Sequence, residues 1–168
     1  DAIHRQRVEL AEMLSAPLAR LAGKCAAVWG QREALDIELT DHFREVPHCL
    51  FLYVLDSNGI QISDNVSTGG LLPEHYGRDR SQRPYMREAV PAWGFLLSDA
   101  YLSRNSRRPT LTAVQHIINE HGALLGYLGA DFDLRELPLT REIYQQPDQW
   151  MQVKGDPAIR SGLFNQQR

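Results

Sequence analysis

The side chains that could hold a charged ligand are concentrated in one window of the sequence. Seven arginines lie between Arg78 and Arg108, a window in which only Asp79, Glu88 and Asp99 are acidic. These residues give the window a formal charge of +4, whereas the chain of 168 residues has a net charge of -3. Such a local electropositive site favours a small anionic ligand and argues against nucleic acid, which would need a broadly basic surface.

Three segments carry the candidate site. They are GRDRSQRPYMREA around Arg83 and Tyr85, LSDAYLSR around Asp99 and Tyr101, and GADFD around Asp131. An arginine at a helix start can hold a carboxylate through paired, charge-assisted hydrogen bonds, helped by the free backbone N–H groups there. The tyrosines would supply walls and hydroxyl groups. The aspartate, at the end of a strand, could receive an ammonium or hydroxyl group of a ligand.

A purely structural role for the same residues is the alternative. Arg83 would then pair with Asp99 or Asp131, and both tyrosines would belong to the core. If the site is real, we expect Arg83 to be the arginine in the pocket and its neighbours to surround the mouth. In the structural alternative those neighbours are simply solvated: Arg78, Arg80 and Arg87.

The sequence offers little support for other chemistries. The six histidines show no metal-site spacing, and the segment beginning at Asp56 lacks the closing glutamate of a calcium loop. No phosphate-binding or nucleophile motif is present. We therefore expect no enzyme activity, no metal and no cofactor. Cys25 and Cys49 are either two reduced thiols, which we favour, or one disulfide.

Apolar periodicity predicts two helices near the N-terminus. A stripe with steps of three and four residues predicts a long helix from about Ile3 to Trp29, with a kink or a restart at Pro17. A shorter stripe predicts a second helix that ends before Pro47. The long stripe consists of Leu10, Leu14, Leu18, Leu21, Cys25 and Val28, and the short one of Leu35, Leu39, Phe43 and Val46.

Strand patterns follow the helices. We expect a first strand over Cys49 to Leu55, a tight turn, and a second strand over Ile60 to Ile62. A long loop, Ser67 to Ser81, and a short helix, Gln82 to Val90, come next. Three more strands are predicted: Phe95 to Tyr101, Thr110 to Ile118 and Ala123 to Phe132. The fold class is thus α+β, with a long helix packed on a five-stranded antiparallel sheet.

Four motifs, spread over residues 50–137, resemble a known family. The segments YVLDSNGIQISDN, GRDRSQRPYMREA, FLLSDAYLSRNSRRPTLTAVQHI and GALLGYLGADFDLREL are similar to the Cache (PDC, PAS-like) sensor domain, in its single-module form. The resemblance implies a PAS-like sheet with an N-terminal helical stalk at 1–48 and a sensor core at 49–137. From Pro138 onward the apolar density falls and Pro147 and Pro157 interrupt the pattern, so we expect 138–168 to be a connector toward a further module.

The resemblance also implies a function and a site. It implies the ligand-sensing domain of a bacterial signal-transduction protein, generally periplasmic. In amino-acid-binding relatives, an Arg-Pro-Trp-Tyr motif, a later tyrosine and an aspartate clasp the ligand, and these match Arg83, Tyr85, Tyr101 and Asp131. Met86 replaces the second aromatic residue, which leaves an amino acid, another small carboxylate or an empty pocket open. Two further residues complete the expected ligand site: Arg78 and Asp99.

We expect ligand binding to pass a conformational signal to a downstream signalling domain. The alternative is a structural module that dimerises through the long helix and has a vestigial pocket, although Arg5, Glu9, Glu12 and Arg20 interrupt the outer face of that helix. An arginine-rich nucleic-acid contact is a weaker third idea. A cytoplasmic location is the alternative to a periplasmic one.

Overall fold

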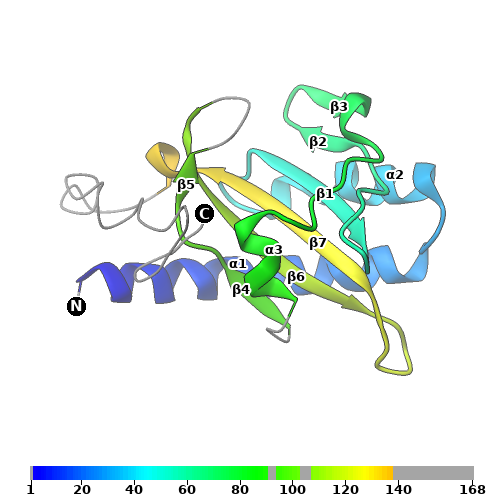
Figure 1. Ribbon diagram of the computed structural model, residues 1–168, viewed down its shortest axis with the longest axis horizontal. Coiled ribbons are helices and arrows are strands. Elements are labelled where there is room, and N and C mark those ends of the chain that lie inside the picture. Colours follow the sequence, from blue (N-terminus) through cyan, green and yellow to red (C-terminus); the bar gives the residue numbers. More distant parts are fainter. Residues whose placement is uncertain (1, 91–93, 103–106, 138–168) are drawn as a thin grey trace.

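The computed structural model describes residues 2–90, 94–102 and 107–137, with side chains from Arg5 onward. Helices cover a single antiparallel sheet in this part of the chain (Figure 1). The connector that we predicted for 138–168 lies outside the described residues. The elements are, in order, α1 (Ala2–Ala27), α2 (Arg32–His42), η1 (Phe43–Glu45), β1 (Phe51–Asp56), β2 (Asn65–Ser67), β3 (Gly70–Leu72), η2 (Pro73–His75), α3 (Pro84–Ala89), β4 (Phe95–Leu97), β5 (Tyr101–Leu102), β6 (Pro109–Ile118), β7 (Leu124–Asp133) and η3 (Leu134–Glu136).

The apolar stripe of α1 explains its position on the sheet. Leu14, Leu18 and Cys25 are fully buried on one face of the helix, as their spacing requires. The helix runs as one element through Pro17, so the predicted restart at that residue is wrong. Packing of the leucines on both sides of the proline holds the two halves in one helix. Within the described residues, no helix is long and apolar enough to cross a membrane.

Both cysteines are free thiols, which confirms the reduced state that we favoured. Cys25 lies on the core-facing side of α1, where burial raises its pKa to about 12. Burial also raises the pKa of Cys49 well above its ordinary value. Because the thiolate is the reactive form, both thiols are unreactive at neutral pH.

In the part of the chain that the structure describes, the sheet has seven strands in place of the five that we predicted. Their order is β3-β2-β1-β7-β6-β4, and β5 also pairs with β6. The predicted second strand, Ile60 to Ile62, forms only isolated bridges, whereas β2 begins at Asn65. The side chain of Ser63 accepts a hydrogen bond from the Val54 backbone N–H at 2.8 Å, which takes the place of a ladder bond.

The strand that we predicted for Phe95 to Tyr101 is divided into β4 and β5. Between them, the Ser98 hydroxyl accepts a hydrogen bond from the Thr112 backbone N–H at 3.0 Å. Arg7 of α1 donates to the carbonyl oxygens of Leu97 and Ser98 at 3.0 and 3.2 Å. Side chains therefore satisfy backbone groups that a continuous strand would have paired.

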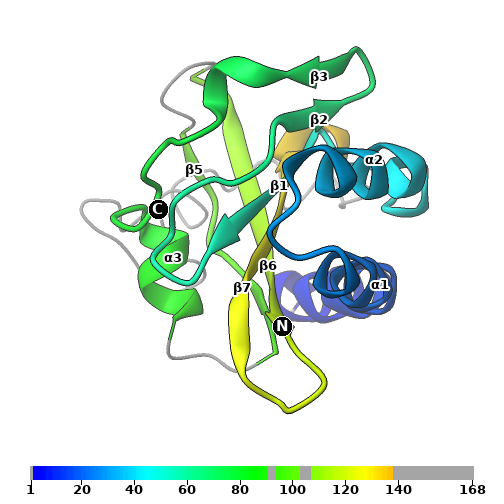
Figure 2. The ribbon, with the colours of Figure 1, turned by 90° about the vertical axis from the view of Figure 1, so that its right-hand side faces the viewer.

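Alternation along the central strands sorts side chains onto two faces of the sheet. Leu52 and Val54 of β1 belong to the core cluster that α1 and α2 cover, and Tyr53 and Leu55 belong to a second cluster with α3. Figure 2 shows α1 and α2 on one side of the sheet and α3 on the other. The face with α3 carries the candidate site.

Candidate ligand-binding site

Asp131 of β7 is the centre of the site. Its register partner on β6, Thr112, donates a hydrogen bond to its Oδ1 at 2.8 Å, and the Tyr53 hydroxyl donates to the same oxygen at 2.8 Å. None of the described residues donates a hydrogen bond to the second oxygen, Oδ2. One half of the carboxylate is thus fixed by the protein, and the other half can bind a ligand.

Burial sets the protonation behaviour of this carboxylate. It raises the pKa of Asp131, and this effect outweighs the opposing influence of Arg80, of Thr112 and of Tyr53. A cationic group of a ligand would favour the ionised carboxylate and relieve part of that cost. The site is therefore suited to receive an ammonium group.

Two further tyrosines form the wall beside Asp131. Tyr101 shares a hydrogen bond with the Thr112 hydroxyl and stacks on Tyr85, with ring centroids 5.8 Å apart. Burial raises the pKa of Tyr53 and of Tyr101 well above the ordinary value. Both remain neutral hydrogen-bonding hydroxyls at physiological pH.

Arg80 is buried, which corrects our expectation that it would lie at the mouth of the pocket or in solvent. Only 6% of the residue is exposed. Its Nε donates to Gln61 Oε1 at 2.8 Å, its Nη2 to Asn65 Oδ1 at 3.3 Å and its Nη1 to the Tyr85 hydroxyl at 3.3 Å. The guanidinium also lies over the ring of Tyr53, 4.0 Å from the centroid. These contacts thus fix the positions of the Tyr53 and Tyr85 side chains.

Arg80 stays charged in this environment. Burial alone would lower its pKa, but the hydroxyls of Tyr85 and Tyr53 and the carboxylate of Asp131 outweigh that effect and raise it. A buried cation with several neutral acceptors is costly to remove, since its partners would lose their donor. Its place in the network is therefore structural.

Arg83, which we expected inside the pocket, is partly exposed at the N-cap of α3. Its guanidinium forms no hydrogen bond or ion pair with any of the described residues. It nevertheless lies close enough to Asp131 to contribute to lowering the pKa of that carboxyl group. The predicted alternative of an Arg83 salt bridge to Asp99 or Asp131 is wrong, and the guanidinium can bind an anion.

Tyr85 and Met86 are both buried in the small core cluster under α3, with exposed fractions of 2% and 1%. The hydroxyl of Tyr85 still reaches the site, because it lies 3.4 Å from the hydroxyl of Tyr53. Met86 packs as a core residue in the place where the resembled motif has an aromatic ring. The two residues support the site from the α3 side.

The structure does not bring Asp99 into this network. Arg7 of α1 forms an ion pair with Asp99 at 3.7 Å and donates to the adjacent backbone carbonyls. Burial lowers the pKa of Arg7, and Asp99 opposes that effect. Asp99 therefore anchors the N-terminal part of α1 to the sheet. Arg78, also predicted, is partly buried in the segment that leads to Arg80.

Sequence reasoning missed several residues of the site. Tyr53 and Thr112 hold Asp131, and Gln61 and Asn65 hold Arg80. Tyr53 could have been found, because the alternation of β1 and β7 places it on the face that carries Asp131. The contacts of Gln61 and Asn65 arise from a loop whose course the sequence pattern does not define.

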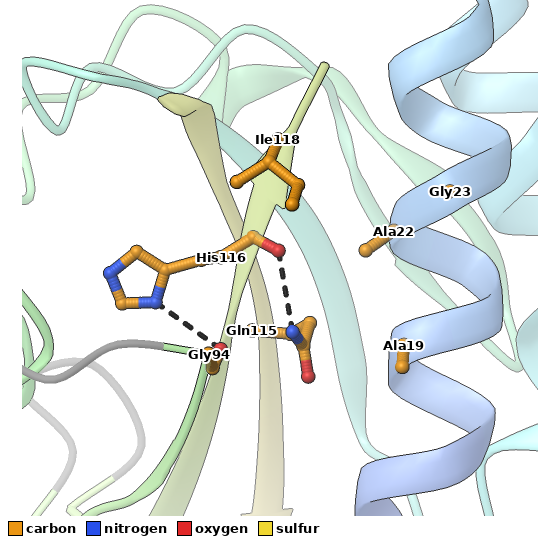
Figure 3. Close-up of a pocket in the computed structure, with 7 residues that line it drawn as sticks. All are labelled: Ala19, Ala22, Gly23, Gly94, Gln115, His116 and Ile118. Atoms are coloured by element: carbon orange, nitrogen blue, oxygen red, sulfur yellow. Dashed lines mark hydrogen bonds between the residues drawn. The ribbon is translucent and has the colours of Figure 1, made fainter. Parts of the chain in front are cut away.

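A separate cavity of about 240 Å³ lies on the α1 side of the sheet. Figure 3 shows α1 opposite β6, with the ring of His116 pointing away from the helix. Among the described residues that line the cavity there is no carboxylate, lysine or arginine, so these residues lack the charged groups that the sequence indicated. Its lining residues are Ala19, Ala22, Gly23, Gly94, Gln115, His116 and Ile118. Among the described residues, no cluster of three potential metal ligands occurs.

Comparison with solved structures identifies the fold. The ligand-binding domain of the Campylobacter jejuni chemoreceptor Tlp3 in complex with 4-methylisoleucine matches with a TM-score of 0.62 and 18% identity, over 79% of this chain and 53% of that one. The Pseudomonas aeruginosa amino acid chemoreceptor PctC in complex with GABA matches with a TM-score of 0.55 and 17% identity, over 76% and 57%.

An extracellular ligand binding receptor from Desulfohalobium retbaense matches with a TM-score of 0.62 and 12% identity, over 80% of this chain and 24% of that one. This chain therefore spans between about a quarter and just over half of the length of these structures. No protein-family model matches the sequence, and no curated protein matches it either. The predicted resemblance to the Cache sensor domain is confirmed at the level of the fold.

Proposed function

We propose that this chain, which has the Cache sensor fold, is a ligand-sensing domain for a small carboxylate-bearing metabolite, in the first place an amino acid. The observation that carries the proposal is the carboxylate of Asp131, which accepts hydrogen bonds from the described residues at one oxygen only, with the guanidinium of Arg83, which has no partner among those residues, near it. An α-amino acid presents an ammonium group and a carboxylate on one carbon, and it would bring one to each of these side chains. The structures with the same fold that bind 4-methylisoleucine and GABA support this class of ligand.

The same fold supports a non-enzymatic sensing role in an extracytoplasmic compartment. We infer that the ligand signal leaves through α1, because this helix packs on β6, which contributes Thr112 to the site. Arg7 also fastens α1 beside Tyr101 through Asp99. We propose a downstream signalling domain as the partner in this role, and a second copy of the chain against α1 as a further partner.

Calorimetry against a panel of L-amino acids and small carboxylates tests the proposal. The tightest ligand should lose at least about 100-fold in affinity in Asp131→Asn and in Arg83→Ala, because each variant removes one ion pair in a partly desolvated site. Arg87→Ala is the matched control, since Arg87 is exposed on the same short helix and its guanidinium donates a hydrogen bond only to Gln82 among the described residues. A ligand that binds Arg83→Ala and the parent protein equally well would refute the site.

A further inference from the structure

Three arginines of one short segment surround the site. The backbone of Arg78 to Arg80 pairs antiparallel with Gly59 to Gln61, through hydrogen bonds of 2.9 Å from Gln61 N–H to Arg78 O and from Arg80 N–H to Gly59 O. On either side of such an isolated antiparallel bridge, residues two apart in extended backbone lie on the same face. Arg78 is therefore on the face of Arg80, which packs against Tyr53, and Arg83 follows at the start of α3.

Arg78 is surrounded by positive charge. Burial lowers its pKa first, and repulsion from Arg80 and Arg83 lowers it further. Its guanidinium forms no hydrogen bond or ion pair with the described residues. An anion placed between Arg78 and Arg83 would relieve this repulsion.

His75 lies in the same group of side chains. Its Nδ1 is buried and has no hydrogen-bond partner among the described residues. Burial lowers its pKa, Arg78 and Arg80 lower it further, and Asp131 is among the charges that oppose them. The imidazole is therefore neutral at pH 7 and has a ring nitrogen available for a ligand.

The charges near the site do not balance. Three positive groups lie near two negative ones: Arg78, Arg80 and Arg83 against Asp131 and the exposed Glu74. The charge of Glu74 acts on both Arg78 and His75. A neutral amino acid would use Asp131 and Arg83 and would add no net charge, so it would leave the excess positive charge of the segment unchanged. A second negative group on the ligand would remove it.

We propose that the ligand is an acidic amino acid whose side-chain carboxylate binds at a second subsite formed by Arg78 and His75. This proposal rests on the proposed function, because Asp131 and Arg83 bind the α-ammonium and α-carboxylate groups. Hydrogen bonds from a guanidinium to a carboxylate are roughly twice as strong as those between neutral groups. The subsite should therefore distinguish a side-chain carboxylate from the amide of the same shape.

Calorimetry with L-glutamate, L-aspartate, L-glutamine and L-asparagine, at one pH and one salt concentration, tests the subsite. We expect at least one acid to bind about tenfold or more tightly than its amide. Arg78→Gln should reduce that ratio toward one, and His75→Ala should reduce the affinity for the acid. Arg87→Gln is the control for the loss of one exposed positive charge, and it should keep the ratio.

The outcomes separate the two proposals. Amides that bind as tightly as the acids, with binding lost in Asp131→Asn, would overturn the subsite and leave the proposed function standing. An acid–amide ratio that persists in Arg78→Gln would also overturn the subsite. An amino acid that binds Asp131→Asn as tightly as the parent protein would overturn the proposed site itself.

Discussion

The ring of Tyr53 lies directly against the backbone of Gly129, its register partner on the neighbouring strand β7. A Cβ atom on residue 129 would come within 2.2 Å of Tyr53 Cε1 and 2.6 Å of Tyr53 Cζ. The hydroxyl of this ring donates to Asp131, two residues further along β7. The glycine therefore determines where the ring lies and, through it, how the carboxylate is held.

We predict that Gly129→Ala weakens ligand binding by about tenfold or more. The added methyl group must displace the Tyr53 ring, because real Cβ atoms do not approach a ring carbon so closely, and the hydroxyl then leaves Asp131. Calorimetry with the tightest ligand of the panel measures the change. Gly23→Ala is the control, since a Cβ there meets no atom within 4 Å and should leave affinity unchanged. Parent-like affinity in Gly129→Ala would contradict the view that Gly129 determines the position of the Tyr53 ring.

Arg80→Met should lower the free energy of unfolding by about 2–3 kcal/mol, because Gln61 Oε1 and the Tyr85 hydroxyl lose a charged donor in a buried place. Urea denaturation followed by circular dichroism measures this difference. The exposed Arg87→Met should change stability by less than about 0.5 kcal/mol. Equal losses in the two variants would show that the buried network contributes nothing beyond the charge.

Asp131→Asn should weaken ligand binding and raise the free energy of unfolding. Because burial raises the pKa of Asp131 above its ordinary value of 3.8, the folded protein binds this proton more tightly than the unfolded chain does. Ionisation of Asp131 therefore destabilises the folded state as pH rises through the folded pKa, and the effect is complete above it. The asparagine can still accept hydrogen bonds from Tyr53 and Thr112 and carries no such cost.

Urea denaturation of the parent protein and Asp131→Asn, without ligand and over a range of pH, measures this effect. The variant should be the more stable protein at neutral pH, and its advantage should shrink as pH falls toward 3.8 and vanish below that value. Taking the difference between the two proteins removes the contributions of other carboxyl groups, such as Asp133, whose pKa its partners lower. A difference that is constant with pH would contradict the predicted linkage.

Asp99→Asn should affect stability and leave ligand affinity within about twofold. The change removes the ion pair with Arg7, which lies in a largely buried place, and should cost about 1–2 kcal/mol of unfolding free energy. Glu9→Gln, an exposed change on α1, is the control. A loss of affinity comparable to that of Asp131→Asn would instead restore Asp99 to the ligand site, where the sequence had placed it.

The parts of this fold that follow from sequence are those with a long, regular pattern. The stripe around Leu14 and Leu18 determines α1, and the hairpin of β6 and β7 follows from two apolar runs separated by a turn at Asn119 to Gly122. The short strands could not be predicted, because segments of two or three residues are too short to show a regular alternation. Nor does the sequence pattern show that the side chain of Ser63 replaces a ladder bond of Val54.

The sequence indicated only part of the candidate site. Asp131 and Tyr101 follow from the resemblance, and the structure brings them to either side of Thr112. The sequence could not show which arginine between positions 78 and 83 is buried, because the bridge between Ile60 and Asp79 determines which side chains point inward. Nor could it show the partner of Asp99, which lies 92 positions away in α1.

The contacts of Arg80 with Tyr53 and Tyr85 have a consequence for the rate of ligand association. Arg80 fixes the rings of Tyr53 and Tyr85 through contacts within the protein, so the proposed binding would require little rearrangement of these rings. The guanidiniums of Arg78 and Arg83, which have no hydrogen-bond or ion-pair partner within the described ranges, would attract an approaching anion over several ångströms of solvent. Association should therefore proceed close to the encounter limit and slow as ionic strength rises, and differences in affinity among ligands should arise chiefly from how long each one stays bound.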